Sequence, residues 1–202
     1  MKLIVMTKPT FFVEEDKILA TLFEEGLESL HLSKSSAEPV YTERLLTLLS
    51  EEYRNRITVH NHYYLKEEFR LRGIHLDSDT DVLPAGYKGA VGRTCRHIEE
   101  LKEMKRRSNY VLLANMFDSL SNPSEKQTLN ADQLKEASRR GIIDKRVYAM
   151  GGMTLENIRT AKDYGFGGVV VCGDLWNRFN IHHEKDFKEL LTHFEKLRKA
   201  AG

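Results

Sequence analysis

Several features that mark specialised classes of protein are scarce or absent in this sequence. Cys95 and Cys172 are its only cysteines, and their spacing matches no metal-binding motif. Lys and Arg total 31 against 30 for Asp and Glu, so the net charge of +1 offers no basic surplus for nucleic acid or an anionic membrane. No apolar run is long enough to span a bilayer, and residues 1–6 lack the long apolar stretch of a signal peptide. These absences favour a cytoplasmic enzyme or binding protein.

Short apolar runs alternate with amphipathic stretches along the whole chain. Hydrophobic residues make up 41% of the 202 residues and charged residues 30%, enough for one core and a hydrophilic surface. Alternating strands and helices imply parallel strands joined by right-handed crossovers, and eight candidate strands favour a closed barrel over an open sheet. We therefore predict a single-domain (β/α)₈ TIM barrel over residues 1–202. The predicted strands are 3–6, 29–32, 57–59, 73–76, 89–91, 110–114, 146–149 and 168–171.

Apolar residues that recur every three or four positions identify the helices between these strands. One buried helix face is predicted to hold Leu45, Leu46, Leu48 and Leu49. Another helix is predicted to begin at Arg96, with Thr94 or Cys95 near its cap. The polar residues 118–130 are predicted to form a long loop over the mouth of the barrel, and loops of this length are commonly functional.

Two glycine-bearing turns near the C-terminus are the most informative feature of the chain. Residues 147–154 and 167–173 each contain an apolar run that stops in a turn, and the segment between them has helical character. Glycine lets a ligand approach the backbone closely, and successive amide N–H groups at a helix start form a concave anion site. Both turns follow the C-terminal end of a parallel strand, where the last strands of a TIM barrel commonly hold a phosphate. We therefore predict a phosphate site at these turns, in preference to glycines that only tighten them.

Motifs spread over nearly the full length share the pattern of a known family. They are Ala149-Met150-Gly151-Gly152-Met153-Thr154 with Asn157, residues 168–173, Gly73-Ile74-His75-Leu76, Val91-Gly92-Arg93-Thr94, Leu30-His31-Leu32, and Tyr110-Val111-Leu112 leading into Asn115-Met116-Phe117. On these motifs the chain resembles the superfamily of thiamine phosphate synthase and the thiazole tautomerases.

The resemblance implies a transferase of thiamine biosynthesis. Such a synthase joins hydroxymethylpyrimidine diphosphate to thiazole phosphate and releases pyrophosphate with the help of Mg²⁺. Cations, hydroxyl donors and a metal are needed because negative charge leaves with the diphosphate. The implied partners are small phosphorylated thiazole and pyrimidine ligands, and a homodimer is expected. The thiazole phosphate is expected on Gly151, Gly152, Cys172 and Gly173.

The remaining site positions carry altered residues in this chain. By resemblance, catalytic roles fall on Lys34, His31 and Asn115, and Lys34 is the single cation left of an Arg-x-Lys pair. Asp79 is the implied metal ligand in a shifted register. Substrate contacts are implied for Asn61, where synthases have a carboxylate, and for Thr94, Ser119, Ser121 and Asn122, the last in place of a lysine.

These substitutions leave two alternatives open. One is a thiazole phosphate tautomerase, whose catalytic histidine corresponds to Asn115. An amide cannot shuttle a proton near neutral pH, so the role would pass to another histidine, namely His31, His60, His62 or His75. His31 and His75 are also interpreted as hydrogen-bonded barrel residues, and His60 with His62 and Asp79 as a metal-binding set. The other alternative is a phosphate-ligand binding protein whose catalytic groups have eroded.

Overall fold

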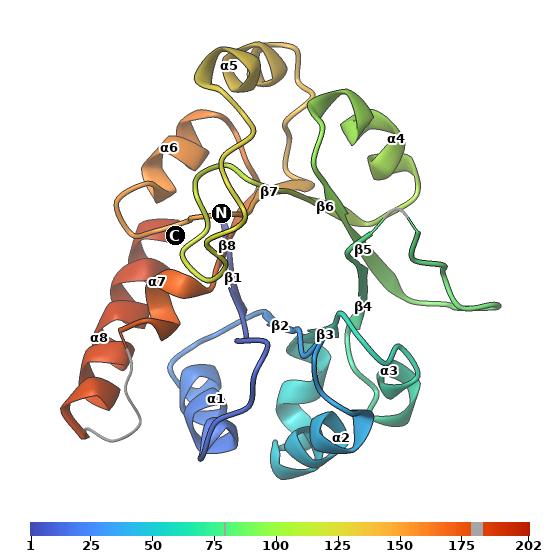
Figure 1. Cartoon of the computed structure of the whole chain (residues 1–202), viewed down its shortest axis with the longest axis vertical. Coiled ribbons are helices and arrows are strands. Elements are labelled where there is room, and N and C mark those ends of the chain that lie inside the picture. The colour runs from blue at the N-terminus through green and yellow to red at the C-terminus, as the bar shows by residue number, and fades with distance from the viewer. Residues whose placement is uncertain (79, 179–183) are drawn as a thin grey trace.

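The computed structural model describes residues 1–78, 80–178 and 184–202, so the implied metal ligand Asp79 lies outside the described residues. Parallel strands close into a barrel in the order β1-β2-β3-β4-β5-β6-β7-β8, and helices surround the ring (Figure 1). Parallel pairing of β1 with β8, with Lys2 opposite Gly168, completes the closure. The predicted TIM barrel is confirmed.

The element bounds follow the predicted strand and helix order closely. The strands are β1 Lys2–Met6, β2 Leu30–Leu32, β3 Ile57–Val59, β4 Gly73–Leu76, β5 Ala90–Cys95, β6 Tyr110–Leu113, β7 Val147–Ala149 and β8 Gly168–Val171. The α-helices are α1 Glu15–Glu24, α2 Pro39–Leu48, α3 Leu65–Glu68, α4 Leu101–Arg106, α5 Ala131–Arg139, α6 Ile158–Asp163, α7 Gly173–Trp176 and α8 Glu184–Ala201, with 3₁₀ helices η1 Glu51–Arg56 and η2 Ile98–Glu100.

Two local predictions are wrong. Leu48 is 60% exposed, because the buried face of α2 continues through Leu45, Leu46 and Leu49 at helical spacing and Leu48 points to the other side. Thr94 does not cap a helix, because pairing with β6 extends β5 as far as Cys95.

The interior of the barrel has an apolar side and a polar side. Ile4, Leu112, Tyr148 and Val170 from β1, β6, β7 and β8 form a small buried cluster inside the ring. The strands β2 to β5 instead place buried polar side chains there, namely His31, Thr58, His75 and Thr94. Side chains of a strand alternate between its two faces, so the neighbours of these residues pack outward in the larger core beneath the helices.

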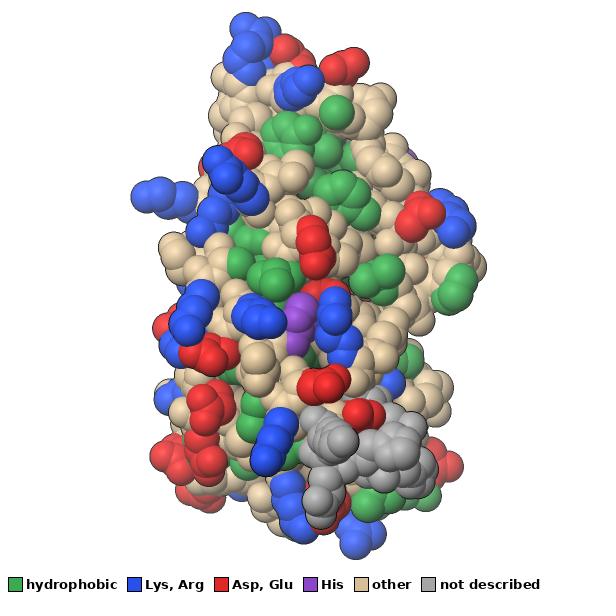
Figure 2. Space-filling view, turned by 90° about the vertical axis from the view of Figure 1, so that its left-hand side faces the viewer, with side chains coloured by type: hydrophobic (Ala, Val, Ile, Leu, Met, Phe, Trp, Pro, Cys, Tyr) green, Lys and Arg blue, Asp and Glu red, His purple; other side chains and the backbone are tan. Residues whose placement is uncertain are grey.

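The outer surface carries charges of both signs. On the face shown in Figure 2, Lys and Arg side chains are interspersed with Asp and Glu, and hydrophobic side chains are scattered between them. In the parts of the chain that the structure describes, no helix has the length and hydropathy needed to cross a membrane.

Candidate functional site

A cavity of about 260 Å³ lies at the C-terminal ends of the strands. Its lining includes all four residues of the predicted phosphate site, Gly151, Gly152, Cys172 and Gly173. The sequence prediction that both glycine turns face the same end of the barrel is therefore confirmed.

The backbone at the two glycine turns is arranged to receive an acceptor. Gly151 and Gly152 have φ angles of 95° and 60°, a left-handed conformation that glycine adopts without strain. Gly173 begins the short helix α7. No described residue accepts a hydrogen bond from the amide N–H of Gly151, Gly152 or Gly173. The turns therefore present unpaired donors at the wall of the cavity.

The loop between β6 and α5 covers these turns, as Figure 1 shows by its course across the ring beside β7 and β8. A Cβ atom on Gly152 would lie 2.3 Å from the carbonyl oxygen of Asp118, and one on Gly173 would lie 2.5 Å from Cβ of Leu120. The side-chain amide of Asn177 donates to the carbonyl oxygen of Leu120 at 2.9 Å. The lack of a side chain at Gly152 and Gly173 therefore lets this loop approach the backbone closely. From the sequence, we expected such an approach only from a ligand.

Hydroxyl groups of this loop reach the cavity. Ser119 and Ser121, two of the implied substrate contacts, line it, and their Oγ atoms are 3.3 Å apart. Asn122 is exposed and turned into the loop, where its Oδ1 accepts from the Ser124 hydroxyl at 2.7 Å. The structure therefore brings the two serines to the cavity and leaves Asn122 at the outside of the loop.

Another part of the cavity wall carries a carboxylate, Asp77, and a guanidinium group, Arg96, which are close together. Asp77 is 43% exposed and lines the cavity together with Arg96 and Thr94. Arg96 donates to the backbone carbonyl oxygen of Asp77 at 3.2 Å, and the Thr94 hydroxyl donates to Oδ1 of Asp77 at 3.3 Å. Among the described residues that line the cavity, Arg96 is the one with a permanent positive charge.

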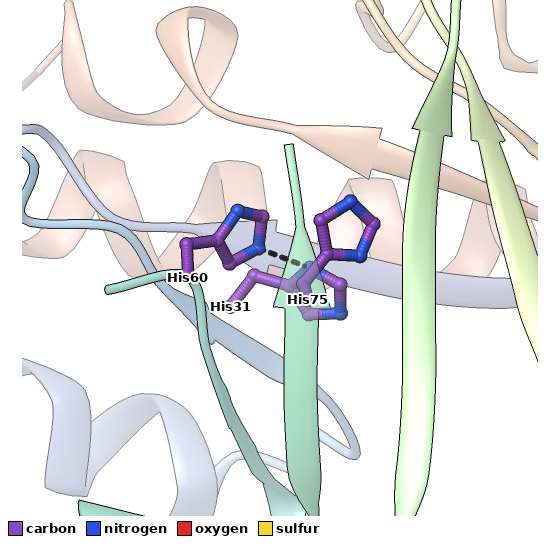
Figure 3. A group of neighbouring side chains, drawn as sticks. All are labelled: His31, His60 and His75. Carbon is purple, nitrogen blue, oxygen red and sulfur yellow. Dashed lines mark hydrogen bonds between the residues drawn. The ribbon is translucent and has the colours of Figure 1, made fainter. Parts of the chain in front are cut away.

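Three buried histidines, His31, His60 and His75, lie close together (Figure 3), and His60 contacts Asp77. Nδ1 of His60 lies 2.9 Å from both carboxylate oxygens of Asp77, and Nε2 of His60 lies 2.9 Å from Nδ1 of His31. On the other side, Nε2 of His31 lies 3.2 Å from the Tyr110 hydroxyl. His60 lines the cavity, so it connects Asp77 with the barrel interior.

His75 completes the group from β4. Its Nε2 lies 2.9 Å from Oγ1 of Thr94 and its Nδ1 lies 3.3 Å from the Tyr110 hydroxyl. Burial and the neighbouring His60 hold the pKa values of His31 and His75 well below the ordinary value. The interpretation of His31 and His75 as hydrogen-bonded barrel residues therefore agrees with the structure. His62 points elsewhere, with Nε2 3.2 Å from the carbonyl oxygen of Ala37, so it does not join His60 as a ligand pair.

Lys34 has a position that the sequence analysis did not foresee. Its side chain is buried, and its Nζ donates to Oε1 of Glu15 at 2.6 Å and to the carbonyl oxygen of Thr10 at 2.9 Å. Burial raises the pKa of Glu15 and lowers that of Lys34, while the attraction between the two groups opposes both shifts. The ammonium group is thus neutralised beside the cavity, which the preceding residue Ser33 lines.

Asn115 and Asn61 both lie at the mouth of the barrel, just after strands β6 and β3. Asn115 follows β6, has a φ of 62° and lines the cavity. Asn61 follows β3, and its Oδ1 accepts from the backbone N–H of Lys34 at 2.9 Å. Asn61 therefore fixes the turn after β2, while Asn115 is placed to contact a bound ligand.

Asp77 was recognisable from the sequence as a polar residue directly after β4, where active-site groups of such a barrel lie, but no role was assigned to it. Arg96 was not predicted as a site residue. Asp77 and Arg96 each come two positions after an inward-facing side chain, His75 and Thr94 respectively. Arg96 could not be assigned to the cavity because a helix was predicted to begin there. Its actual position depends on the continuation of β5 to Cys95.

The fold and the site define a class of protein: a TIM barrel with a cavity, lined by two glycine turns, at the C-terminal ends of its strands. A model of the thiamine monophosphate synthase family matches residues 7–175. The chain belongs to this family. The predicted membership and the prediction of an enzyme of thiamine biosynthesis are thereby confirmed.

Individual relatives agree with this membership. The crystal structure of a thiamine phosphate pyrophosphorylase from Bacteroides thetaiotaomicron is 47% identical, has a TM-score of 0.88, and the match covers 99% of this chain and 97% of that one. A thiamine-phosphate synthase from Flavobacterium johnsoniae is 26% identical over 157 residues, which cover 72% of this chain and 70% of the relative. A thiamine phosphate pyrophosphorylase structure from Pyrococcus furiosus, 18% identical with a TM-score of 0.75 over 98% of this chain and 94% of that one, shares the fold.

Proposed function

We propose that this protein is a thiamine phosphate synthase, which joins hydroxymethylpyrimidine diphosphate to thiazole phosphate at the C-terminal cavity and releases pyrophosphate. The observation that carries the proposal is the unpaired amide N–H groups of Gly151, Gly152 and Gly173 on one wall of the cavity. They suit the phosphate of the thiazole substrate because several donors can share its negative charge.

The leaving diphosphate needs positive charge and hydroxyl donors on the other walls. Arg96 supplies a cation, and Ser119 and Ser121 supply hydroxyl groups from the covering loop. Asn115 can donate from its amide. Hydrogen bonds and charge that are already in place stabilise the negative charge as it develops on the departing oxygen. In this arrangement Lys34 contributes through its ion pair with Glu15, which holds the turn next to Ser33.

The family implies Mg²⁺, and the oxygen donors at the cavity fit it. Magnesium is usually held by one or two carboxylates together with substrate phosphates and waters. Asp77 and Glu125 both line the cavity and could serve in this way. The resemblance also implies Asp79, which lies outside the described residues. When bound, the ion supplies charge neutralisation for the diphosphate.

The remaining partners and the location follow from this reaction. The substrates are small phosphorylated compounds, no nucleic acid or membrane takes part, and we propose a homodimer in the cytoplasm. The tautomerase alternative finds less support, because the amide of Asn115 does not take up or release a proton near neutral pH and because His31 and His75 are fully buried.

The test is the release of pyrophosphate by purified protein with both substrates and Mg²⁺. We expect turnover that requires each substrate, with no release when either one is omitted. Omission matters because a hydrolase, which uses water in place of the thiazole, would release pyrophosphate from the pyrimidine substrate alone. Absence of turnover with both substrates, in a protein that still binds thiazole phosphate, would leave only a ligand-binding role.

A further inference from the structure

We propose that His31, His60 and His75 form a binding site for a transition-metal ion of the Zn²⁺ class, inside the barrel and beneath the cavity. Figure 3 shows the imidazoles converging from β2, the end of β3 and β4. Each offers one nitrogen, and the three nitrogens lie within 4.8 Å of one another. Three imidazoles with a free fourth position are a donor set that zinc and related ions favour.

Outer hydrogen bonds hold two of the rings in the orientation that a metal ligand needs. Asp77 fixes Nδ1 of His60 at 2.9 Å, which directs Nε2 of His60 toward Nδ1 of His31. The Tyr110 hydroxyl holds the far nitrogen of His31 at 3.2 Å. Metal-ligating histidines usually bind a carboxylate or another polar group through the second nitrogen, which sets the tautomer. His60 and His31 thus already present their inner nitrogens to a common point.

The protonation of the histidines and the distances between their nitrogen atoms are both compatible with a bound ion. In the metal-free protein the two inner nitrogens, 2.9 Å apart, share one proton. An ion would take the place of that proton, which moves to Nε2 of His31 beside Tyr110. Because a zinc–nitrogen bond is about 2.0–2.1 Å long, ligand nitrogens around the ion lie roughly 3.3 Å apart. The His60–His31 pair would open slightly and His75 would close in.

The surroundings also favour binding. All three side chains are buried, and neutral imidazole is the form that binds metal. His60 and Thr94 line the C-terminal cavity, which gives an ion a way in and leaves a fourth position for water. The ligands of this site are nitrogen atoms, whereas those proposed for Mg²⁺ are oxygen atoms, and Asp77 lies between the two sites. Binding of Co²⁺ by the histidines is measured without the substrates, so the proposal does not depend on the synthase activity.

The test is a titration of chelator-treated protein with Co²⁺, whose visible absorption reports a tetrahedral nitrogen site. We expect saturation at one equivalent, displacement by Zn²⁺, and no displacement by a large excess of Mg²⁺. His60→Ala and His75→Ala should abolish the absorption. The matched control is His62→Ala, which removes a histidine two positions from His60 that contacts Ala37 instead.

A second variant keeps the test decisive if the alanine variants fail to fold. Asp77→Asn preserves the shape of a 43%-exposed side chain and removes the carboxylate behind His60. Loss of such an outer partner typically lowers metal affinity about 10–100-fold, and we expect a decrease in that range. If wild-type protein shows no absorption, or if the absorption is unchanged in Asp77→Asn and in both histidine-to-alanine variants, Co²⁺ does not bind at these histidines and the proposal is wrong.

Discussion

At the scale of single residues, a buried ion pair sits beside a cavity that needs positive charge. The Oε2 atom of Glu15 has no hydrogen-bond partner among the described residues, while Oε1 binds Lys34. Removing one member of a buried pair leaves the other charge buried alone, which typically costs about 3–5 kcal/mol. Lys34→Ala should therefore lower the free energy of unfolding by about that amount in a urea titration.

A double variant separates the stability of this pair from catalysis. Glu15→Leu with Lys34→Met replaces both charges by apolar groups and should recover most of the lost stability. The exposed pair Lys17–Glu14 provides the control, since Lys17→Ala should leave stability unchanged within error. If Lys34 also contacts diphosphate, the stable double variant loses turnover; if it retains turnover, Lys34 has a structural role alone.

Arg96 is the residue on which the proposed charge neutralisation depends most. Arg96→Gln keeps a hydrogen-bond donor and removes the charge, so kcat should fall by about 10²-fold, the size of effect seen when one stabilising donor is lost. Steady-state pyrophosphate release measures it. Arg159→Gln, on the exposed side of α6, is the matched control and should behave like the wild type. Equal rates for both variants would show that another group neutralises the diphosphate.

At the scale of elements, the loop between β6 and α5 closes over the phosphate turns and is attached to α7. The Asn177 amide makes that attachment by donating to the carbonyl oxygen of Leu120. Asn177→Ala should raise the KM for thiazole phosphate, because the serine hydroxyls of a looser loop are less well positioned. Steady-state pyrophosphate release at a series of thiazole phosphate concentrations measures this KM.

Stability should change little in this variant, because the contact is exposed. Asn55→Ala, in the exposed part of η1, is the control for removing an asparagine side chain. An unchanged KM in Asn177→Ala would show that the loop position does not depend on α7.

A second contact between elements should make stability depend on pH. Asp174 of α7 accepts hydrogen bonds from His193 of α8 at 2.7 Å and from the backbone N–H of Leu155 at 3.1 Å. Burial alone would raise the pKa of Asp174, but the hydrogen bonds from His193 and Arg178 bring it below the ordinary value. A lowered pKa in the folded state stabilises the protein above the unfolded pKa, and this contribution is lost as the pH falls through the folded pKa.

Asp174→Asn should therefore be less stable than the wild type at neutral pH, and the difference should shrink as the pH falls below about 4. Urea unfolding at a series of pH values measures it. Asp163→Asn, on the exposed face of α6, controls for the loss of one carboxylate. A difference that stays constant into acid would mean that the ionised form of Asp174 adds nothing to stability.

At the scale of the whole molecule, the strand pattern and the glycine turns could be predicted because each depends on local chemistry. Most of the strands coincide with short apolar runs, and a turn that requires glycine can be recognised from the residues of the turn alone. The burial of Lys34 could not be predicted in this way. It depends on Glu15, a residue from the preceding helix that only the folded barrel brings within 2.6 Å.

The arrangement of His31, His60 and His75 could be predicted from the sequence only in part. His31 and His75 occupy inward positions of their strands, so alternation along β2 and β4 could have placed both inside the barrel. Their contact with His60 also requires the register between neighbouring strands, in which His31 pairs with Thr58 and His75 with Gly92. Register across a closed barrel is a property of the whole molecule, and no single segment contains it.

The synthase reaction is tested most directly by the yields of thiamine phosphate and pyrophosphate in one reaction mixture, followed by phosphorus NMR. With both substrates and Mg²⁺, we expect one molecule of thiamine phosphate for each molecule of pyrophosphate, and the thiazole phosphate signal should decrease by the same amount. Loss of the diphosphate without thiamine phosphate, or no change in either substrate, would contradict it.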